Sequence, residues 1–374
     1  MQQSTGAIML AGSAGDCPDI EYATGFRAMD PVLYLRRRRR AVLVVPEMEA
    51  GRAERTARGV SVATPRGLGL VGTTRRGLAE WAVALARRER VRAIRVPDSF
   101  PHGVARRLQR AGVRVHLLRG AAFPERAVKT PEELRRMAET QQAAVIAMRA
   151  AIALIEAASV DADGFLRCRG RRLTSEDVRR AIAKVLFDHT CLCREVIVAG
   201  GRQAADPHER GHGPLREREA IVIDIFPQHE GHGYWGDLTR TVVKGAASRA
   251  LRAMYDAVRS AQSAALAQVR GGVQCRTVHL SAAREFERRG LRTTRRPGGG
   301  MGFIHGTGHG VGLAVHEAPS LGLNRQRLRR GNVVTVEPGL YYPDVGGVRI
   351  EDTVVVTRGG WRYLAPCEQR FELA

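Results

Sequence analysis

The sequence predicts an α/β domain at the amino terminus, followed by an α+β domain whose mainly antiparallel sheet is covered by helices. Up to about residue 128, short apolar runs alternate with amphipathic stretches, which is the pattern of an α/β layer. A linker and a strong helix-start signal follow within residues 123–134. Beyond them, apolar strands that carry acidic residues alternate with amphipathic helices. The 374 residues are sufficient for two domains with separate cores.

In the amino-terminal domain, residues 1–128, we expect short strands connected by helices. The strands are predicted at residues 8–10, 20–23, 41–45, 60–63, 93–96 and 113–118, and the helices at residues 48–58, 75–90 and 103–111. Five consecutive arginines, residues 36–40, precede the third strand, and we interpret them as a solvated turn between strands. Nothing in this domain indicates catalysis, and we interpret His102 and His116 as surface residues rather than ligands.

The second domain, residues 129–374, opens with a long helix. Thr130 can cap its amino terminus, Pro131 suits the first helical position, and Glu133 completes a capping box with Thr130. Apolar residues then recur at steps of three and four as far as Ile155, so the helix is predicted to end near Ala158.

The other elements of this domain follow from the same two periodicities. Helices are predicted at residues 174–186, 248–269 and 278–289, and strands at residues 195–199, 333–337 and 348–356. Asp224 and Asp237 flank a predicted β-hairpin, whose turn, residues 227–233, is rich in turn-forming residues. Adjacent antiparallel strands can direct these two carboxylates toward one point.

The chain has a formal net charge of +22, which suggests nucleic acid or an acidic membrane surface as a partner. However, lysine occurs only at Lys129, Lys184 and Lys244, so arginine supplies nearly all the positive charge and is scattered over the whole length. A GC-rich coding sequence accounts for this bias. We therefore expect no nucleic-acid partner.

The six cysteines have neither the spacing of a zinc site nor the density of a disulfide-rich protein. We expect reduced thiols and a cytoplasmic location. Residues 7–12 form a short apolar run without a preceding basic residue, and no apolar run approaches the ~20 residues of a membrane span. We interpret residues 7–12 as a first strand and expect no association with a membrane.

A histidine- and glycine-rich stretch, residues 305–317, carries the residues best suited to chemistry. A neutral imidazole binds divalent metal ions well, and glycine allows backbone and substrate to approach closely. Four carboxylates elsewhere lie in or beside apolar strands, where an unpaired charge is costly to bury. These candidates are His305, His309 and His316, with Asp224, Asp237, Glu337 and Glu351. Four acids and one histidine suggest two metal ions that share one site.

The donor types restrict the metal. Carboxylates and imidazole without a thiolate are compatible with manganese, iron, cobalt or zinc, and the excess of carboxylates favours manganese. His229 and His232 lie in the hairpin turn, and we exclude them as ligands because that turn is expected to point away from the site.

The ligand pattern, in this order, resembles that of the pita-bread metallopeptidases, which include methionine aminopeptidase, aminopeptidase P, prolidase and the metal-free creatinase. The resemblance covers nearly the whole chain, because residues 22–31 look like the opening of a creatinase-type amino-terminal domain and residues 129–134 look like the start of the catalytic domain. It implies a curved pita-bread sheet in residues 129–374. It also implies an amino-terminal domain that supports a homodimer and covers the active site.

The resemblance further implies a role for each ligand. Asp237 and Glu351 bridge two ions, Asp224 binds one of them, and His309 and Glu337 bind the other. Such a pair lowers the pKa of a shared water, so that a bridging hydroxide is available at neutral pH, and holds the oxyanion that develops.

Five further roles concern proton transfer and substrate binding. Glu337 is also expected to shuttle a proton from the water to the departing amine, and His316 to donate to the region of the substrate carbonyl. His208 and His305 are expected to line the side that receives the leaving group; by position, His212 is the rival of His208. In the last strand, alternation places three residues on one face: Arg349, Glu351 and Thr353. Glu351 can therefore face the metals with Arg349 beside it, and Arg349 is expected to bind substrate.

Two features favour one branch of the family. The pair His305 and His309, and residues 347–352, look like those of aminopeptidase P and prolidase. We therefore expect hydrolysis of the bond between an amino-terminal residue and a following proline, in a dipeptide or a longer peptide. The alternatives are a creatinase-like amidinohydrolase, a metal-dependent lyase, and an inactive protein that binds partners through its basic surface.

Overall fold

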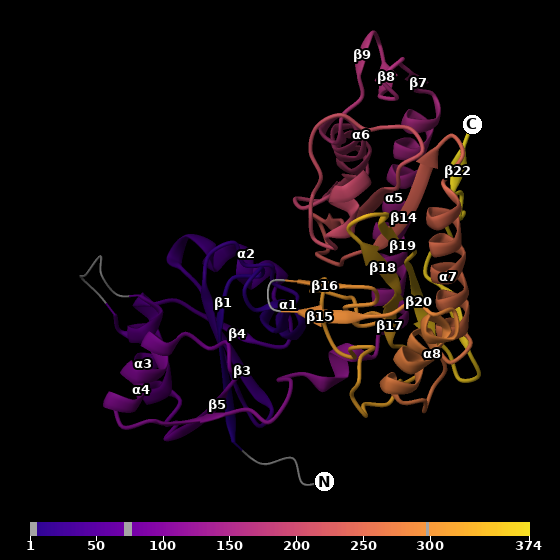
Figure 1. Cartoon of the computed structure of the whole chain (residues 1–374). Coiled ribbons are helices and arrows are strands. Elements are labelled where there is room, and N and C mark those ends of the chain that lie inside the picture. Colours follow the sequence, from indigo (N-terminus) through magenta and orange to yellow (C-terminus); the bar gives the residue numbers. More distant parts are fainter. Residues whose placement is uncertain (1–5, 71–76, 297–298) are drawn as a thin grey trace. The chain divides into compact units, whose positions relative to one another are not determined.

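The computed structural model describes residues 6–70, 77–296 and 299–374 (Figure 1). The chain forms two compact units, Met1–Arg126 and Ala127–Ala374. Within the described residues, no helix is both long enough and apolar enough to cross a membrane.

The amino-terminal unit is built on a mixed six-stranded sheet. Its strands are β1 (Ala7–Gly12), β2 (Val32–Arg37), β3 (Arg40–Val44), β4 (Ser61–Ala63), β5 (Ala93–Val96) and β6 (Arg114–Leu117), in the order β4-β3-β2-β1-β5-β6. Its α-helices are α1 (Pro18–Thr24), α2 (Ala50–Thr56), α3 (Leu78–Arg88) and α4 (His102–Arg110). Alternate residues of β1 belong to different cores: Met9 packs with α3 and α4, whereas Leu10 packs with α1 and α2. The sheet therefore has helices on both faces.

Two elements of this unit differ from the prediction. Residues 20–23 belong to helix α1 and not to a strand, because Pro18 begins the helix and Gly25 ends it in the left-handed conformation (φ 67°). Strand β2 was not predicted; it extends into the arginine run, so that only Arg38 and Arg39 form the turn to β3. The first two residues of the predicted helix at 75–90 lie outside the described residues.

The carboxy-terminal unit has two halves, each with a pair of helices packed on strands (Figure 1). In the first half, α5 (Pro131–Glu156) and α6 (Ser175–Asp188) pack against β11 (Ile197–Gly200), β12 (Ile221–Ile225), β14 (Leu238–Lys244) and β22 (Glu372–Leu373). In the second half, α7 (Arg249–Leu266) and α8 (Cys275–Arg288) pack against β17 (Val333–Val336), β18 (Gly339–Tyr342), β19 (Gly346–Arg349), β20 (Asp352–Val356) and β21 (Trp361–Tyr363).

The remaining elements of the chain are short. The strands are β7 (Ser159–Val160), β8 (Leu166–Cys168), β9 (Arg171–Arg172), β10 (Cys191–Leu192), β13 (Gln228–His229), β15 (Thr294–Arg296) and β16 (Gly299–Met301). The 3₁₀ helices are η1 (Glu47–Glu49), η2 (Arg66–Leu68), η3 (Pro124–Ala127) and η4 (Gly201–Ala205).

The long helix α5 begins where the sequence predicts. The Thr130 hydroxyl accepts a hydrogen bond from the Glu133 backbone N–H, and the Glu133 carboxylate accepts one from the Thr130 N–H. Helix α6 starts with the same reciprocal arrangement, formed by Thr174 and Asp177. Both capping boxes are therefore confirmed.

The predicted strand at residues 348–356 is interrupted and forms two strands. β19 ends at Arg349 and β20 begins at Asp352, because β19 pairs with β18 whereas β20 pairs with β17. The chain thus changes its partner strand at Ile350 and Glu351. The predicted hairpin of β12 and β14 is confirmed, although its long connection contains β13, which pairs with β10.

Candidate metal centre

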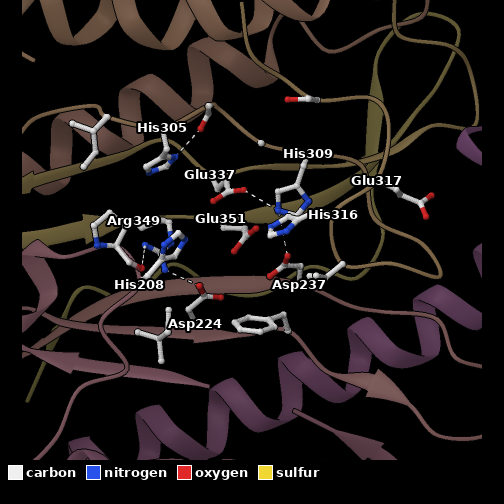
Figure 2. Close-up of a pocket in the computed structure, with 18 of the residues that line it drawn as sticks. His208, Asp224, Asp237, His305, His309, His316, Glu317, Glu337, Arg349 and Glu351 are labelled. Carbon is white, nitrogen blue, oxygen red and sulfur yellow. Dashed lines mark hydrogen bonds and ion pairs between the residues drawn. The ribbon is translucent and has the colours of Figure 1, made fainter. Parts of the chain in front are cut away.

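All residues proposed for the site line one cavity of about 900 Å³ in the carboxy-terminal unit (Figure 2). They are His208, Asp224, Asp237, His305, His309, His316, Glu337, Arg349 and Glu351. We call five of them, Asp224, Asp237, His309, Glu337 and Glu351, the ligand cluster. The apolar part of the cavity wall includes Ile197, Phe226, Ile304 and Val315. Among the described residues that line the cavity, His208 is present and its rival His212 is absent.

Two aspartates reach the cavity from one end of the β12–β14 ladder. Asp224 lies opposite Thr239 in this antiparallel pair, and Asp237 immediately precedes β14. Both carboxylates therefore lie where the hairpin opens toward its long connection.

Two glutamates reach the cavity from one end of the β17–β20 ladder. Val336, the last residue of β17, pairs with Asp352, the first residue of β20. Glu337 follows β17 and Glu351 precedes β20, so both glutamates lie at the same end of the ladder. The Glu351 backbone N–H donates to the Thr239 carbonyl oxygen (3.1 Å), which joins this ladder to the β12–β14 ladder. The meeting of the two ladders explains how acids far apart in sequence converge.

The histidine-rich stretch runs along β17. The Thr335 backbone N–H donates to the His309 carbonyl oxygen (2.8 Å), and the His309 N–H donates to the Thr335 hydroxyl (3.0 Å). Glycine is required at position 308, because a Cβ there would overlap the Thr335 carbonyl group. This close approach places the His309 ring beside Glu337.

Asp237, His309 and Glu351 form the innermost group, with potential ligand atoms all within 4.8 Å of one another. His309 Nε2 lies 3.6 Å from Asp237 Oδ2 and 3.2 Å from Glu337 Oε1. His309 Nδ1 faces the Gly310 carbonyl oxygen at 3.1 Å. In a metal-bound form a proton on Nδ1 can be donated to that carbonyl, which would leave the lone pair of Nε2 for the ion, as in metal-binding histidines.

Asp224 differs from the other acids because it pairs with a buried arginine. Arg349 Nη2 donates to Asp224 Oδ2 at 2.6 Å, and Arg349 Nη1 donates to the Tyr341 hydroxyl at 2.8 Å. The second oxygen, Asp224 Oδ1, is buried and has no hydrogen-bond partner among the described residues. A buried anionic oxygen without a donor fits a cation ligand, so the donor set suits divalent metal ions.

The electrostatics of the ligand cluster also favour positive charge. Burial raises the pKa of Asp237 and Glu351 well above their ordinary values, and neighbouring carboxylates raise them further. Burial opposes ionisation of both His309 and Glu337, yet their mutual hydrogen bond and charge attraction raise the pKa of His309 to about 9 and lower that of Glu337 to about 2. The crowded acids thus stabilise a cation at their centre.

Two other imidazoles of the cavity, His305 and His316, favour the neutral form. Burial lowers the pKa of both His305 and His316. His305 Nε2 lies 2.9 Å from the Tyr341 hydroxyl, and the His316 ring stands edge-on to the His309 ring with centroids 4.2 Å apart. Neutral imidazoles can offer an N–H to a substrate.

Several supporting residues were not predicted from the sequence. Gln141 on α5 holds the Asp237 backbone through both amide atoms, each at 2.8 Å. The Thr239 hydroxyl donates to Glu351 Oε2 at 2.6 Å, and the Thr335 hydroxyl donates to Glu337 Oε1 at 3.0 Å. For the two threonines, the sequence signal is a threonine two residues from an acid in or beside a strand. For Gln141, we find no signal in the sequence.

Comparisons with known proteins identify the family of the chain. Residues 135–358 match the sequence profile of metallopeptidase family M24. An Xaa-Pro dipeptidase of Pyrococcus furiosus is 37% identical over 177 residues, which are 47% of this chain and 48% of that protein. The chain thus spans about half the length of the curated relatives it matches.

Solved structures match over nearly the full length. The prolidase from Pyrococcus furiosus superposes with a TM-score of 0.81 at 22% identity, covering 98% of each chain. The X-Pro aminopeptidase from Thermotoga maritima gives 0.80 at 20% identity, covering 99% of this chain and 98% of that one. The predicted architecture, an α/β amino-terminal domain followed by a pita-bread domain, is therefore confirmed.

Proposed function

Because the chain belongs to metallopeptidase family M24, we propose that it hydrolyses the peptide bond between an amino-terminal residue and a following proline. The observation that carries this proposal is the convergence in one cavity of the five-residue ligand cluster and three further histidines, His208, His305 and His316. The names of the relatives, Xaa-Pro dipeptidase and prolidase, support the choice of substrate. We assign the chemistry to residues 129–374 and propose that residues 1–128 support a homodimer.

The ligand cluster holds two divalent ions in this proposal, with manganese favoured by the carboxylates. Asp237 and Glu351 would hold both ions, Asp224 would hold one of them, and His309 and Glu337 would hold the other. When bound, such ions acidify a shared water and polarise the substrate carbonyl.

Glu337 is the proton carrier. As a carboxylate it can accept a proton from the attacking water. The Thr335 hydroxyl holds Oε1 at 3.0 Å and thereby fixes the orientation of the group. Glu337 then returns the proton to the departing proline nitrogen, which must be protonated to leave as an amine.

The cavity walls provide the substrate contacts. His316, neutral beside His309, donates an N–H toward the carbonyl of the scissile bond as negative charge develops. His208 and His305 flank the side that receives the proline. Arg349 lines the same cavity and is proposed to contribute to substrate binding, although in this structure its guanidinium donates to Asp224 and Tyr341. The apolar side chains of Ile304 and Val315 suit the proline ring.

A peptide panel tests this function. Protein stripped of metal and reloaded with Mn²⁺, Zn²⁺ or Co²⁺ is given Ala-Pro, Ala-Ala, Ala-Pro-Ala and Ala-Ala-Ala, and release of alanine is measured. We expect the Pro-containing peptides to be cleaved at least about tenfold faster in kcat/KM, a difference of about 1.4 kcal/mol in transition-state stabilisation. Equal rates for Ala-Pro and Ala-Ala would contradict the proline specificity.

A further inference from the structure

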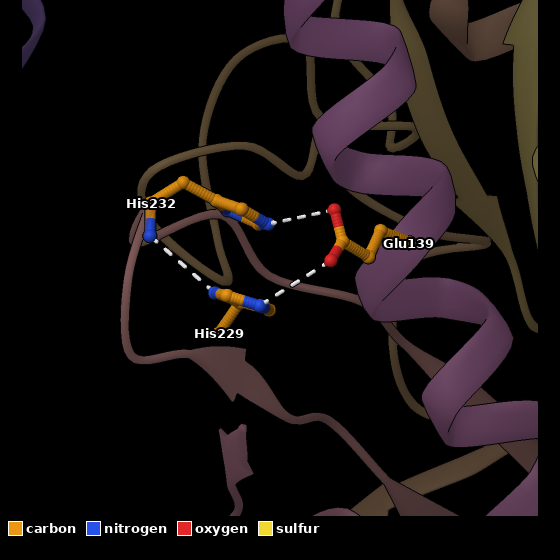
Figure 3. A group of neighbouring side chains, drawn as sticks. All are labelled: Glu139, His229 and His232. Carbon is orange, nitrogen blue, oxygen red and sulfur yellow. Dashed lines mark hydrogen bonds and ion pairs between the residues drawn. The ribbon is translucent and has the colours of Figure 1, made fainter. Parts of the chain in front are cut away.

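A second imidazole–carboxylate group lies outside the ligand cluster, on the surface of the carboxy-terminal unit (Figure 3). It consists of Glu139 on α5 with His229 and His232 from the connection between β12 and β14, and we call it the outer triad. None of its members lines the cavity described above. Each residue offers one ligand atom, and these atoms all lie within 4.8 Å of one another.

We propose that the outer triad binds a single transition-metal ion, with zinc as the best fit and nickel, cobalt or copper as chemical equivalents. His229 Nε2 lies 3.6 Å from Glu139 Oε1, and His232 Nε2 lies 3.8 Å from Glu139 Oε2. These separations are too long for hydrogen bonds. They are close to the spacing of about 3.4 Å between two ligands of a tetrahedral zinc ion.

The loop is held against the helix on both sides of Glu139. The Tyr234 hydroxyl donates to Glu133 at 2.8 Å, and the Thr140 hydroxyl donates to the Tyr234 carbonyl oxygen at 3.2 Å. Gln141 grips the Asp237 backbone with two hydrogen bonds. Because these contacts fix the loop and the helix relative to each other, the histidines need only small movements to share an ion with Glu139.

The arrangement of the two rings defines the proton movement that binding requires. The rings are stacked, with centroids 3.8 Å apart and planes 9° from parallel. His229 Nδ1 accepts the Gly231 N–H at 3.0 Å, and His232 Nδ1 accepts the Tyr234 N–H at 3.3 Å, so each neutral ring carries its proton on Nε2.

Metal binding therefore moves one proton from Nε2 to Nδ1 in each ring. It breaks these two hydrogen bonds and the one that His229 Nδ1 accepts from the His232 N–H at 3.4 Å. No proton is released overall, because a neutral imidazole remains neutral as a ligand. Gly231 is exposed, so water can accept its N–H. The side chain of Glu139 is 54% exposed, so water can also complete the coordination of the ion.

A bound ion would add a further link between the loop and α5. Since Gln141 lies two residues from Glu139 and holds Asp237, this link would restrain the segment that supplies one ligand of the cluster. The inference does not rest on peptidase activity, because the outer triad would bind the ion whatever the cavity does.

Zinc stoichiometry tests the outer triad directly. Full-length protein is dialysed against buffered Zn²⁺ and its zinc content is measured by mass spectrometry for four forms: wild type, H229N/H232N, the matched control H102N/H116N, and the cluster variant D224N/E351Q. His102 and His116 are exposed histidines of the amino-terminal unit, so H102N/H116N changes the amino-acid composition as H229N/H232N does but leaves the outer triad intact.

We expect H229N/H232N to bind about one zinc ion fewer than wild type and control, and the cluster variant to retain about one. Equal zinc content in H229N/H232N and wild type, or none in the cluster variant, would overturn the proposal. Should H229N/H232N lack the far-UV spectrum of the folded chain, E139Q replaces it, since this side chain lies on an exposed helix surface. E139Q is expected to weaken the zinc affinity at least about tenfold, and an unchanged affinity would overturn the proposal.

Discussion

The ligand cluster and the outer triad use the same side-chain types, but their carboxylates lie in opposite surroundings. The cluster residues Asp237 and Glu351 are 5% and 2% exposed, and they lie next to the ends of strands in two sheets. The triad residue Glu139 projects from a helix into solvent, and its histidines belong to a turn. In the cluster, threonines, Gln141 and Arg349 orient the acids, whereas in the triad Nδ1 of each ring accepts a backbone N–H group of the loop.

From this difference we expect burial to decide whether a cation is required or optional. Buried acids that share a small volume repel one another, so a cation relieves an existing electrostatic cost. An exposed carboxylate is already solvated, so a cation there adds a link between two segments without relieving strain. Substitutions in the cluster should therefore alter chemistry and metal-dependent stability, and those in the triad should alter only the extra ion.

The largest expected effect is on catalysis. Glu337→Gln removes the proton carrier while preserving size, so we expect kcat on an Xaa-Pro peptide to fall about 10²–10⁴-fold. The measurement is steady-state hydrolysis with matched metal loading, and far-UV circular dichroism confirms the fold. Glu132→Gln, which alters an exposed acid of α5, serves as control and should retain full turnover. Full turnover in Glu337→Gln would remove this residue from its proposed role.

The next effect concerns the buried ion pair. Arg349→Met leaves Asp224 without its arginine, and breaking a buried pair costs about 3–5 kcal/mol in the free energy of unfolding. Urea titration in the presence of a chelator measures this loss. With saturating Mn²⁺ the loss should be smaller, because the cations then compensate Asp224. An equal loss under both conditions would show that the cations do not act on Asp224.

A smaller effect is expected at Gln141. Gln141→Met keeps the volume but removes both hydrogen bonds to the Asp237 backbone. We expect the affinity of the ligand cluster for Mn²⁺ to fall about 10–100-fold, the usual effect of losing a residue that orients a ligand. Calorimetric titration measures the affinity. Gln142→Met on the exposed side of α5 is the matched control and should bind normally.

The sequence was sufficient to predict that the five residues of the cluster converge, because each sits in a strongly apolar or glycine-rich context. The same holds for α5 and α6, whose capping boxes are local in sequence. The prediction from the sequence was wrong for residues 20–23, because a run of four residues is too short to distinguish a strand from one turn of helix.

Contacts between distant segments could not be predicted. The break at Glu351 arises because β19 and β20 pair with different strands, and sequence alternation does not report the partner strand. The outer triad was missed for a similar reason. The two histidines were visible in the turn, but Glu139 is an ordinary exposed acid of a long helix, and only the fold brings it opposite them.

The smallest effect is expected at Asp177, an acid whose surroundings are the reverse of those in the cluster. Hydrogen bonds from Arg171 lower its pKa, whereas burial raises the pKa values of Asp237 and Glu351. Its capping contribution, about 0.5–2 kcal/mol, is therefore present above the ordinary aspartate pKa of about 3.9 and is lost as the pH falls through the lower folded pKa. Thermal unfolding of Asp177→Asn should show this destabilisation at pH 7, and the gap to wild type should narrow below about pH 4. A gap independent of pH would mean that the carboxylate charge contributes nothing to the cap.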